Sequence, residues 1–163
     1  MNTPRSAQPE PAFMKEAIEL ARRNIREGLG GPFGTVIVKN GTILARGTNL
    51  VTSTNDPTAH GEIVAIRKAC RALGSFQLEG CEIYTSCEPC PMCLGAIYWA
   101  RPKAVYFGNT RDDAAQADFD DRFLYEELPR SFAARRIPMI QFMRDEALVA
   151  FREWGEKADK VRY

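Results

Sequence analysis

The chain contains 163 residues, 45% of them hydrophobic and 26% charged, which is the size and composition of a globular domain with its own core. Its 22 lysines and arginines nearly balance 21 acidic residues, for a net charge of +1. Proteins that bind nucleic acid through phosphates usually carry a basic excess or stripe, and none is visible. The longest apolar run, residues 93–100, is too short to span a membrane, and the N-terminus lacks the apolar core of a secretory signal. We therefore expect no nucleic-acid partner and no membrane.

The chain begins with a predicted tail and an amphipathic helix. Residues 1–11 are expected to be disordered, and residues 12–163 to form a single domain. The helix is expected from about residue 11 to residue 29, just before Gly30-Gly31-Pro32. Its apolar side chains recur every four residues and form one stripe: Phe13, Ala17, Ala21, Ile25 and Leu29.

The rest of the chain predicts a mixed sheet with helices. Asn40-Gly41 is the strongest hairpin signal, and it lies between the predicted strands 35–38 and 42–45. A polar loop leads to a helix at about 59–73. Then follow a strand at 82–85, a helix at 91–100, a strand at 104–107, short helical pieces within 111–136, a fifth strand at 140–143 and a helix at 146–161. This order predicts an α/β fold, a three-layer α/β/α sandwich with a five-stranded mixed sheet.

Two short motifs carry the chemistry of the sequence. The only histidine lies in His60-Gly61-Glu62, and Pro89-Cys90-Pro91-Met92-Cys93 follows later in the chain. H-x-E followed by P-C-x-x-C is the signature of zinc-dependent nucleobase and nucleoside deaminases. We predict one zinc ion per subunit, bound by His60, Cys90 and Cys93, because three protein ligands leave the fourth tetrahedral position open for water.

Helix starts are expected to build this metal site. Pro91 can open a helix because its missing N–H would be unpaired there, so that Cys90 falls at the cap and Cys93 in the first turn. The positive end of a helix lowers thiol pKa values and favours the thiolates that bind zinc. Start signals also precede His60, so two helix N-termini packed side by side would bring the three ligands onto one ion.

Glu62 is the predicted proton carrier. Two thiolates and a neutral imidazole leave zinc formally neutral, so the ion acidifies its water less than zinc with three neutral ligands does. A nearby base must then take the proton, and Glu62 lies close to His60 in sequence without being a ligand. General acid–base help of this kind contributes about 10²–10⁴-fold, in addition to metal activation of the water.

Other interpretations of the motif are open at this point. A C-x-x-C alone is often a structural zinc clasp or a redox pair, and Cys87 could complete a closed site of three cysteines and one histidine. A non-catalytic zinc module used for interaction is the corresponding function. It leaves Glu62 unexplained, so we expect Cys87 to be a buried thiol instead.

The remaining cysteines and the tryptophans bear on the compartment and the core. Five cysteines is an odd number, and two of them lie in a metal motif, which favours a reducing cytoplasm. Cys70 and Cys81 are expected to be small core side chains. Trp99 and Trp154 are also expected in the core, with Trp99 as a candidate wall of the pocket beside the metal.

Longer runs surround the two motifs. They are Gly30-Gly31-Pro32-Phe33-Gly34, Asn55-Asp56-Pro57-Thr58-Ala59-His60, the stretch from Tyr84 to Lys103, Phe119-Asp120-Asp121 and the terminal Tyr163. With these runs the chain, from about Glu16 onward, resembles the bacterial guanine deaminases of the cytidine-deaminase superfamily. The resemblance implies a cytidine-deaminase-like fold and, in purine catabolism or salvage, hydrolysis of guanine to xanthine and ammonia. It implies zinc-bound hydroxide as the nucleophile and Glu62 as the proton shuttle, with Asp121 sharing that catalytic role.

The resemblance also implies how the substrate is held. Asn49 hydrogen-bonds the purine, Phe33 packs on it and Asp121 touches its amine. The expected substrate-binding set is Phe33, Asn49, His60, Gly61, Trp99, Asp121 and Tyr163. A homodimer is expected, in which exchanged C-terminal segments let Tyr163 close the partner's pocket. Gly61 departs from the alanine usual in the family; glycine costs a helix about 1 kcal/mol but allows a closer approach to a ligand.

Alternative substrates are also considered. A tRNA adenosine deaminase shares the zinc signature but needs basic surface for an RNA stem-loop. Residues 111–127 instead hold seven acidic residues against two arginines, which would repel a polyphosphate backbone and suit a neutral base that bears an amine. Guanosine or an aminotriazine, as related small substrates, stay open.

Overall fold

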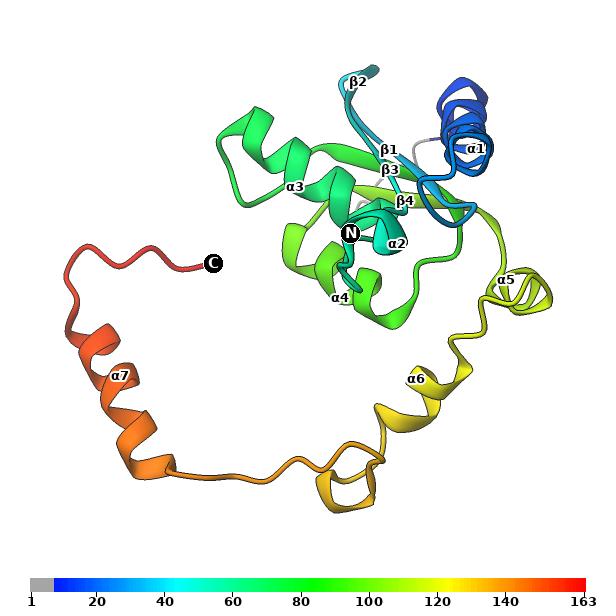
Figure 1. Ribbon diagram of the computed structural model, residues 1–163. Helices are drawn as coiled ribbons and strands as arrows, with labels where there is room; N and C mark the ends of the chain where they lie inside the picture. Colours follow the sequence, from blue (N-terminus) through cyan, green and yellow to red (C-terminus); the bar gives the residue numbers. More distant parts are fainter. Residues whose placement is uncertain (1–7) are drawn as a thin grey trace, which may run out of the picture. The chain divides into compact units, whose positions relative to one another are not determined.

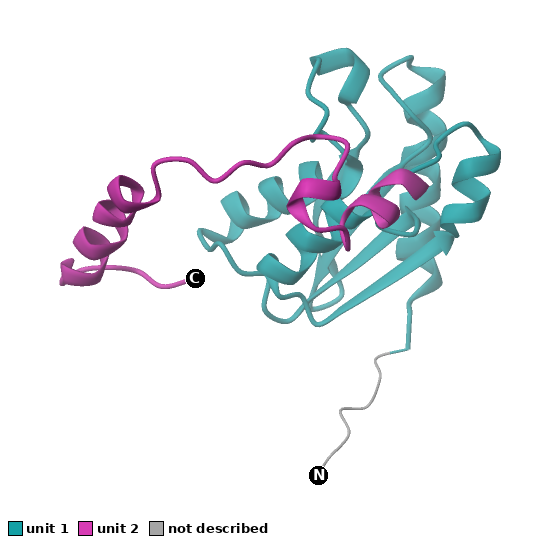
Figure 2. Cartoon of the chain, turned by 90° about the horizontal axis from the view of Figure 1, so that it is seen from below, with its two compact units in different colours: residues 1–121 teal, residues 122–163 magenta. Residues whose placement is uncertain are grey.

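A computed structural model describes residues 8–163 of the chain. The chain divides into two compact units, one through Asp121 and one from Arg122 to Tyr163 (Figure 2). Of the predicted tail, residues 1–7 lie outside the described residues, whereas Glu10 caps the first helix with its carboxylate and Pro11 is the first residue of that helix.

The first unit is built on a four-stranded sheet with the strand order β2-β1-β3-β4. The strands are β1 (Gly34–Lys39), β2 (Thr42–Thr48), β3 (Cys81–Cys87) and β4 (Ala104–Asn109). β1 pairs antiparallel with β2 and β3, and β3 pairs parallel with β4, so the predicted mixed sheet is confirmed. Asn40 and Gly41 close the predicted hairpin with φ angles of 50° and 74°, the left-handed values that a tight two-residue turn requires.

Helices lie on both faces of this sheet (Figure 1). α1 (Pro11–Arg26) packs on one face, and α3 (Gly61–Leu73) and α4 (Pro91–Ala100) pack on the other. The short helices α2 (Val51–Thr54) and α5 (Arg111–Gln116) follow β2 and β4 along the chain. Side chains alternate along β1, so Val36 and Val38 pack under α1, whereas Ile37 faces the other way. On that second face Ile37 joins the core of α3 and α4, with Ala65, Ala69, Ile97 and Ala100.

α3 lies close against the sheet at its first turn. A Cβ atom added to Gly47 of β2 would collide with the carbonyl oxygen of Gly61, the first residue of α3. Only glycine permits this approach of strand and helix backbones. The start of α3, next to His60, is therefore fixed relative to the sheet.

The predicted apolar stripe of α1 is wrong over its second half. Ala17 and Ala21 are buried as expected, but Ile25 and Leu29 are exposed, and Asn24 takes the next position of the buried face. A spacing of four residues drifts away from the 3.6-residue turn of a helix, so the stripe leaves the buried face after two turns. α1 also ends at Arg26, three residues before the predicted end.

The second unit contains α6 (Arg122–Glu127), the short helix η1 (Phe132–Ala134) and α7 (Arg144–Glu156). The predicted fifth strand is wrong, because residues 140–143 adopt no strand and Ile140 is 84% exposed. A strand requires a neighbour that accepts its backbone hydrogen bonds, and this unit offers no other strand within residues 122–163. The predicted short helical pieces within 111–136 are confirmed.

Candidate metal centre

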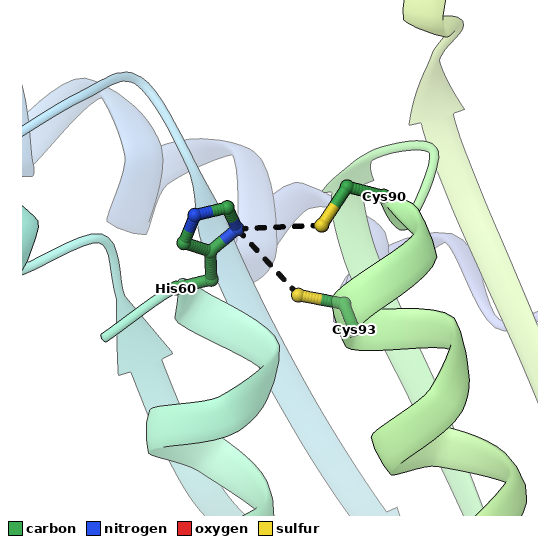
Figure 3. A group of neighbouring side chains, drawn as sticks. All are labelled: His60, Cys90 and Cys93. Carbon is green, nitrogen blue, oxygen red and sulfur yellow. Dashed lines mark hydrogen bonds between the residues drawn. The ribbon is translucent and has the colours of Figure 1, made fainter. Parts of the chain in front are cut away.

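Two helix starts bring together the three predicted metal ligands (Figure 3). His60 is the N-cap residue of α3 and Cys90 that of α4, both with extended backbones. Pro91 follows as the first residue of α4, as predicted, and places Cys93 in the first turn. The Nδ1 atom of His60 lies 3.6 Å from the Sγ atoms of both Cys90 and Cys93.

This cluster has the donor set of a zinc site. One imidazole nitrogen and two thiol sulfurs lie within 4.8 Å of one another, and the described residues hold no other such group of histidine, cysteine or acidic side chains. Soft thiolates with imidazole select zinc, which takes them in tetrahedral geometry. Three protein donors are the number that a catalytic zinc site uses.

The electrostatics of the cluster favour a thiolate at the helix end. A hydrogen bond with Cys93, assisted by His60, lowers the pKa of the Cys90 thiol to about 4. The same contact with Cys90, together with burial, raises the pKa of Cys93. One negative charge is therefore concentrated on Cys90, at the positive end of α4, and a bound cation would stabilise both sulfurs as thiolates.

Glu62 lies beside the cluster without joining it. Its carboxylate is buried, with an exposed fraction of 6% for the residue, and Cys93 donates to Oε2 over 3.5 Å. Burial is the main cause that raises the pKa of Glu62. A carboxyl group with a raised pKa takes up and returns a proton more readily near neutral pH than an exposed one.

Asp121 lies within electrostatic range of the same cluster. Burial raises the pKa of Asp121, and the charge of Cys90 acts in the same direction. The pKa of His60 is raised, chiefly by its hydrogen bond with Cys90 and in part by the charge of Asp121. Asp121, at the end of the first unit, is thus close enough to His60 and Cys90 for their charges to interact.

Cys87 is not part of the cluster. It is buried, and its Sγ donates to the carbonyl oxygen of Thr110 over 3.6 Å. Burial raises the pKa of this thiol to about 11. The geometry thus favours the expected buried thiol over a closed site of three cysteines and one histidine.

Phe33 and Asn49 lie next to each other on loops of the first unit. The amide N–H of Asn49 donates to the carbonyl oxygen of Phe33 over 3.1 Å. The ring of Phe33 meets that of Phe119 edge to face, with centroids 5.0 Å apart. The side chain of Asn49 is buried, and its Oδ1 accepts from the amide of Val51 at the start of α2, which directs the amide nitrogen away from that helix.

The missing side chain at Gly61 faces the sheet. A Cβ at this position would lie 3.1 Å from Oγ1 of Thr35, which hydrogen-bonds Oγ1 of Thr85 across β1 and β3. The nearest obstacles to an alanine are therefore strand atoms. A role of Gly61 in substrate fit would have to come from its backbone.

Trp99, Trp154 and Tyr163 are all more exposed than a core position allows. Trp99 is 62% exposed on α4, so the expectation of a core residue is wrong. Trp154, expected in the core as well, is 43% exposed on α7. Tyr163 is 73% exposed and ends the second unit.

Asn24 and Phe119 are residues that the motif analysis did not assign to the site. Asn24 is buried and hydrogen-bonds the backbone at Gly31 and Asn49, whereas Phe119 packs on Phe33. A helical spacing of three and four residues, from Ala17 through Leu20 to Asn24, would have placed the asparagine on the buried face.

Comparisons with known proteins agree with this geometry. Residues 8–109 match the family described as the cytidine and deoxycytidylate deaminase zinc-binding region. Among the described residues, no helix is long and apolar enough to cross a membrane. The prediction of zinc as the cofactor is confirmed by the family, whose donor set the cluster at His60 provides.

Two similar proteins and one solved structure indicate the branch of the family to which the chain belongs. The guanine deaminase of Bacillus subtilis (strain 168) is 55% identical over 151 residues, which cover 93% of this chain and 97% of that protein. An X-ray structure of guanine deaminase from Bacillus subtilis matches with a TM-score of 0.93 and 53% identity, covering 96% of this chain and 99% of that one. The tRNA-specific adenosine deaminase of the same strain is 45% identical over 96 residues, or 59% of each chain. The chain therefore belongs to the zinc-binding cytidine and deoxycytidylate deaminase family, in the branch of the bacterial guanine deaminases.

Proposed function

We propose that this protein is an enzyme that hydrolyses guanine to xanthine and ammonia. Water adds to the ring carbon that bears the amine; one of its two protons goes to a ring nitrogen, and the other leaves with the amine as ammonia. The observation that carries the proposal is the placement of Glu62, a buried carboxylate 3.5 Å from Cys93 and outside the group of three metal donors. A purely structural zinc site has no use for such a group.

His60, Cys90 and Cys93 would hold the zinc ion, which when bound would lower the pKa of a water molecule and so make it a better nucleophile near neutral pH. Glu62 takes a first proton from that water and delivers it to a ring nitrogen, and then takes the second proton, from the hydroxyl group now on the ring carbon, and delivers it to the leaving amine. Its raised pKa supports this shuttle, because the carboxyl group must gain and lose the proton in each turnover. Asp121 is proposed to accept a hydrogen bond from the amine and to share in proton transfer.

Phe33 and Asn49 are proposed to hold the purine ring. Phe33, already in contact with Phe119, offers an aromatic surface on which a flat heterocycle can pack. The Oδ1 atom of Asn49 accepts from the amide of Val51, and its side-chain nitrogen is a donor suited to an acceptor on the purine. Trp99 and the backbone of Gly61 are proposed as further contacts, and Tyr163 as the residue that closes the pocket of the partner subunit.

A homodimer with exchanged C-terminal segments is proposed as well. It is supported by the large apolar side chains of the second unit, which are exposed within one chain. The five cysteines are all free thiols, which supports a cytoplasmic location. Helices on both faces of the sheet support a three-layer α/β/α arrangement for the domain.

Ammonia release from a panel of substrates tests the function. The panel contains guanine, guanosine, adenine, an aminotriazine and a tRNA, each offered to the zinc-loaded protein and to the protein after metal removal. We expect zinc-dependent release from guanine, with much slower release from the others. Faster ammonia release from tRNA than from guanine would favour a tRNA adenosine deaminase, and release from none of the substrates would favour a non-catalytic zinc module.

A further inference from the structure

Asn24 lies at the centre of a closed ring of hydrogen bonds that joins the two loops of the proposed purine site. We define the Phe33 loop as residues 27–33, between α1 and β1, and the Asn49 connection as residues 49–50, between β2 and α2. We propose that Asn24 is a positioning residue that holds this loop and this connection in one arrangement, so that the purine meets Phe33 and Asn49 in their binding positions. This inference rests on the proposed function for the roles of Phe33 and Asn49.

The ring of hydrogen bonds has four members. The side-chain nitrogen of Asn24 donates to the carbonyl oxygen of Gly31 over 2.9 Å and to that of Asn49 over 2.8 Å. The amide of Phe33 donates to the same oxygen of Gly31 over 2.8 Å. The amide of Asn49 then donates to the carbonyl oxygen of Phe33 over 3.1 Å and closes the ring.

The chemistry of the side chain suits this role and no other in the described structure. A side-chain amide has two N–H donors, and both are used by the two carbonyl oxygens. Asn24 is only 1% exposed, and its Oδ1 has no hydrogen-bond partner among the described residues. A buried polar side chain is costly unless it is hydrogen-bonded, so the paired donors account for an asparagine on the buried face of α1.

Close packing makes the arrangement sensitive to this one side chain. A Cβ added at Gly30 would collide with the carbonyl oxygen of Asn49, so the Phe33 loop and the Asn49 connection pack backbone to backbone there. Asn24 lies on α1, whereas the metal donors lie at the starts of α3 and α4. The inference therefore separates substrate capture from metal binding.

The test compares Asn24→Ser with Leu20→Ala. Serine keeps one donor of shorter reach, whereas Leu20 is a buried residue of the same helix whose side chain packs in the core between α1 and the sheet and makes none of the four hydrogen bonds of the ring. Zinc content, kcat and KM for guanine are measured, together with amide hydrogen exchange over residues 27–33 and 49–51. For Asn24→Ser we expect unchanged zinc content, a KM raised about tenfold with a smaller change in kcat, and faster exchange confined to those two segments. For Leu20→Ala we expect faster exchange across α1 and β1 at nearly constant KM.

Other results overturn the inference. A KM for Asn24→Ser equal to that of the unaltered protein, or an exchange pattern equal to that of Leu20→Ala, shows that Asn24 serves the general core. An insoluble Asn24→Ser next to a folded Leu20→Ala shows a structural residue, not a positioning one. If the unaltered protein does not act on guanine, the proposed function fails, but the exchange comparison still decides whether Asn24 orders the two loops.

Discussion

The two units of the chain differ in how they treat their apolar residues. The first unit buries them on both faces of a sheet. In the second unit no described residue is buried. Its exposed large apolar side chains are Phe123, Leu128, Phe132, Ile137, Met139, Ile140, Phe142, Met143, Val149, Phe151, Trp154, Val161 and Tyr163. Exposed apolar area of this extent is typical of a surface that meets another protein surface.

The two units are therefore expected to have different tasks, catalysis in the first and assembly in the second. The metal donors, Glu62 and the Asn24 ring lie within the first unit, and they are built from the ends of elements that the core holds in place. The second unit has no core of its own that would fix Tyr163. We therefore expect substitutions of the metal donors or Glu62 to alter the chemical step, substitutions in the Asn24 ring to alter how the substrate is held, and substitutions in the second unit to alter assembly and closure of the pocket.

Glu62→Gln should have the largest effect on turnover. A small effect would contradict the assignment of the chemical step to the first unit. Glutamine keeps the size of the side chain but cannot carry the proton, so we expect kcat for guanine to fall by about 10²–10⁴-fold. Zinc content should stay at that of the unaltered protein, because Glu62 is not among the three donors. Glu19→Gln, on the exposed surface of α1, is the matched control. Near-normal turnover by Glu62→Gln would show that another group carries the proton.

Local signals explain which parts of the fold and the site could be predicted. The hairpin at Asn40 and Gly41 and the helix start at Pro91 are set by adjacent residues. The H-x-E and P-C-x-x-C motifs, each at a helix start, predicted the grouping of His60 with Cys90 and Cys93. These elements depend little on the rest of the chain.

Features that depend on distant partners were missed. The run at 140–143 has the composition of a strand, but a strand forms only where a neighbour offers its backbone. The proposed role of Asn24 depends on its hydrogen bond to the carbonyl oxygen of Asn49, 25 positions away, and no local pattern in the sequence reveals such a bond. The predicted four-residue repeat also placed Ile25 on the buried face of α1, where the structure places Asn24.

Phe142→Asp tests the second unit as an assembly surface. Phe142 is exposed within one chain, and burying such a ring against a partner contributes about 1.5–3 kcal/mol. We expect the dimer dissociation constant to rise about a hundredfold, as measured by sedimentation across a concentration series. Gln141→Asp, the adjacent polar position, should have little effect. A protein that is monomeric without substitution would contradict the proposed dimer.

Removing Tyr163 tests the proposed closure of the pocket. Because this residue is far from any metal donor in sequence and belongs to the second unit, its loss should leave zinc content and the chemical step nearly intact. We expect KM for guanine to rise about tenfold and kcat to change less, the pattern of lost substrate binding. Arg162→Ala, in an otherwise intact chain, is the control. Unchanged steady-state kinetics would argue against a lid.

Gly61→Ala should have a smaller effect that depends on Thr35. The added Cβ lies 3.1 Å from Oγ1 of Thr35, so the gain in helix propensity, which is less than about 1 kcal/mol at the first residue of a helix, is offset by crowding. In a Thr35→Ala background the crowding is gone, and the same change should stabilise the protein by less than about 1 kcal/mol. Free energies of unfolding in urea for the two single variants and the double variant give the coupling. Strict additivity would show that the two positions do not interact.

Cys87→Ser should change least, and it separates the open metal site from a closed one. A serine hydroxyl can donate to the carbonyl oxygen of Thr110 as the thiol does, so we expect zinc content to stay constant and kcat/KM to change by less than about threefold. Cys90→Ser is the comparison, because it removes one of the three donors and should release the metal. If Cys87→Ser instead lost its zinc to the same degree, the ion would have four protein donors and no position for water. The first unit would then contain a structural zinc site and no catalytic centre for the second unit to close.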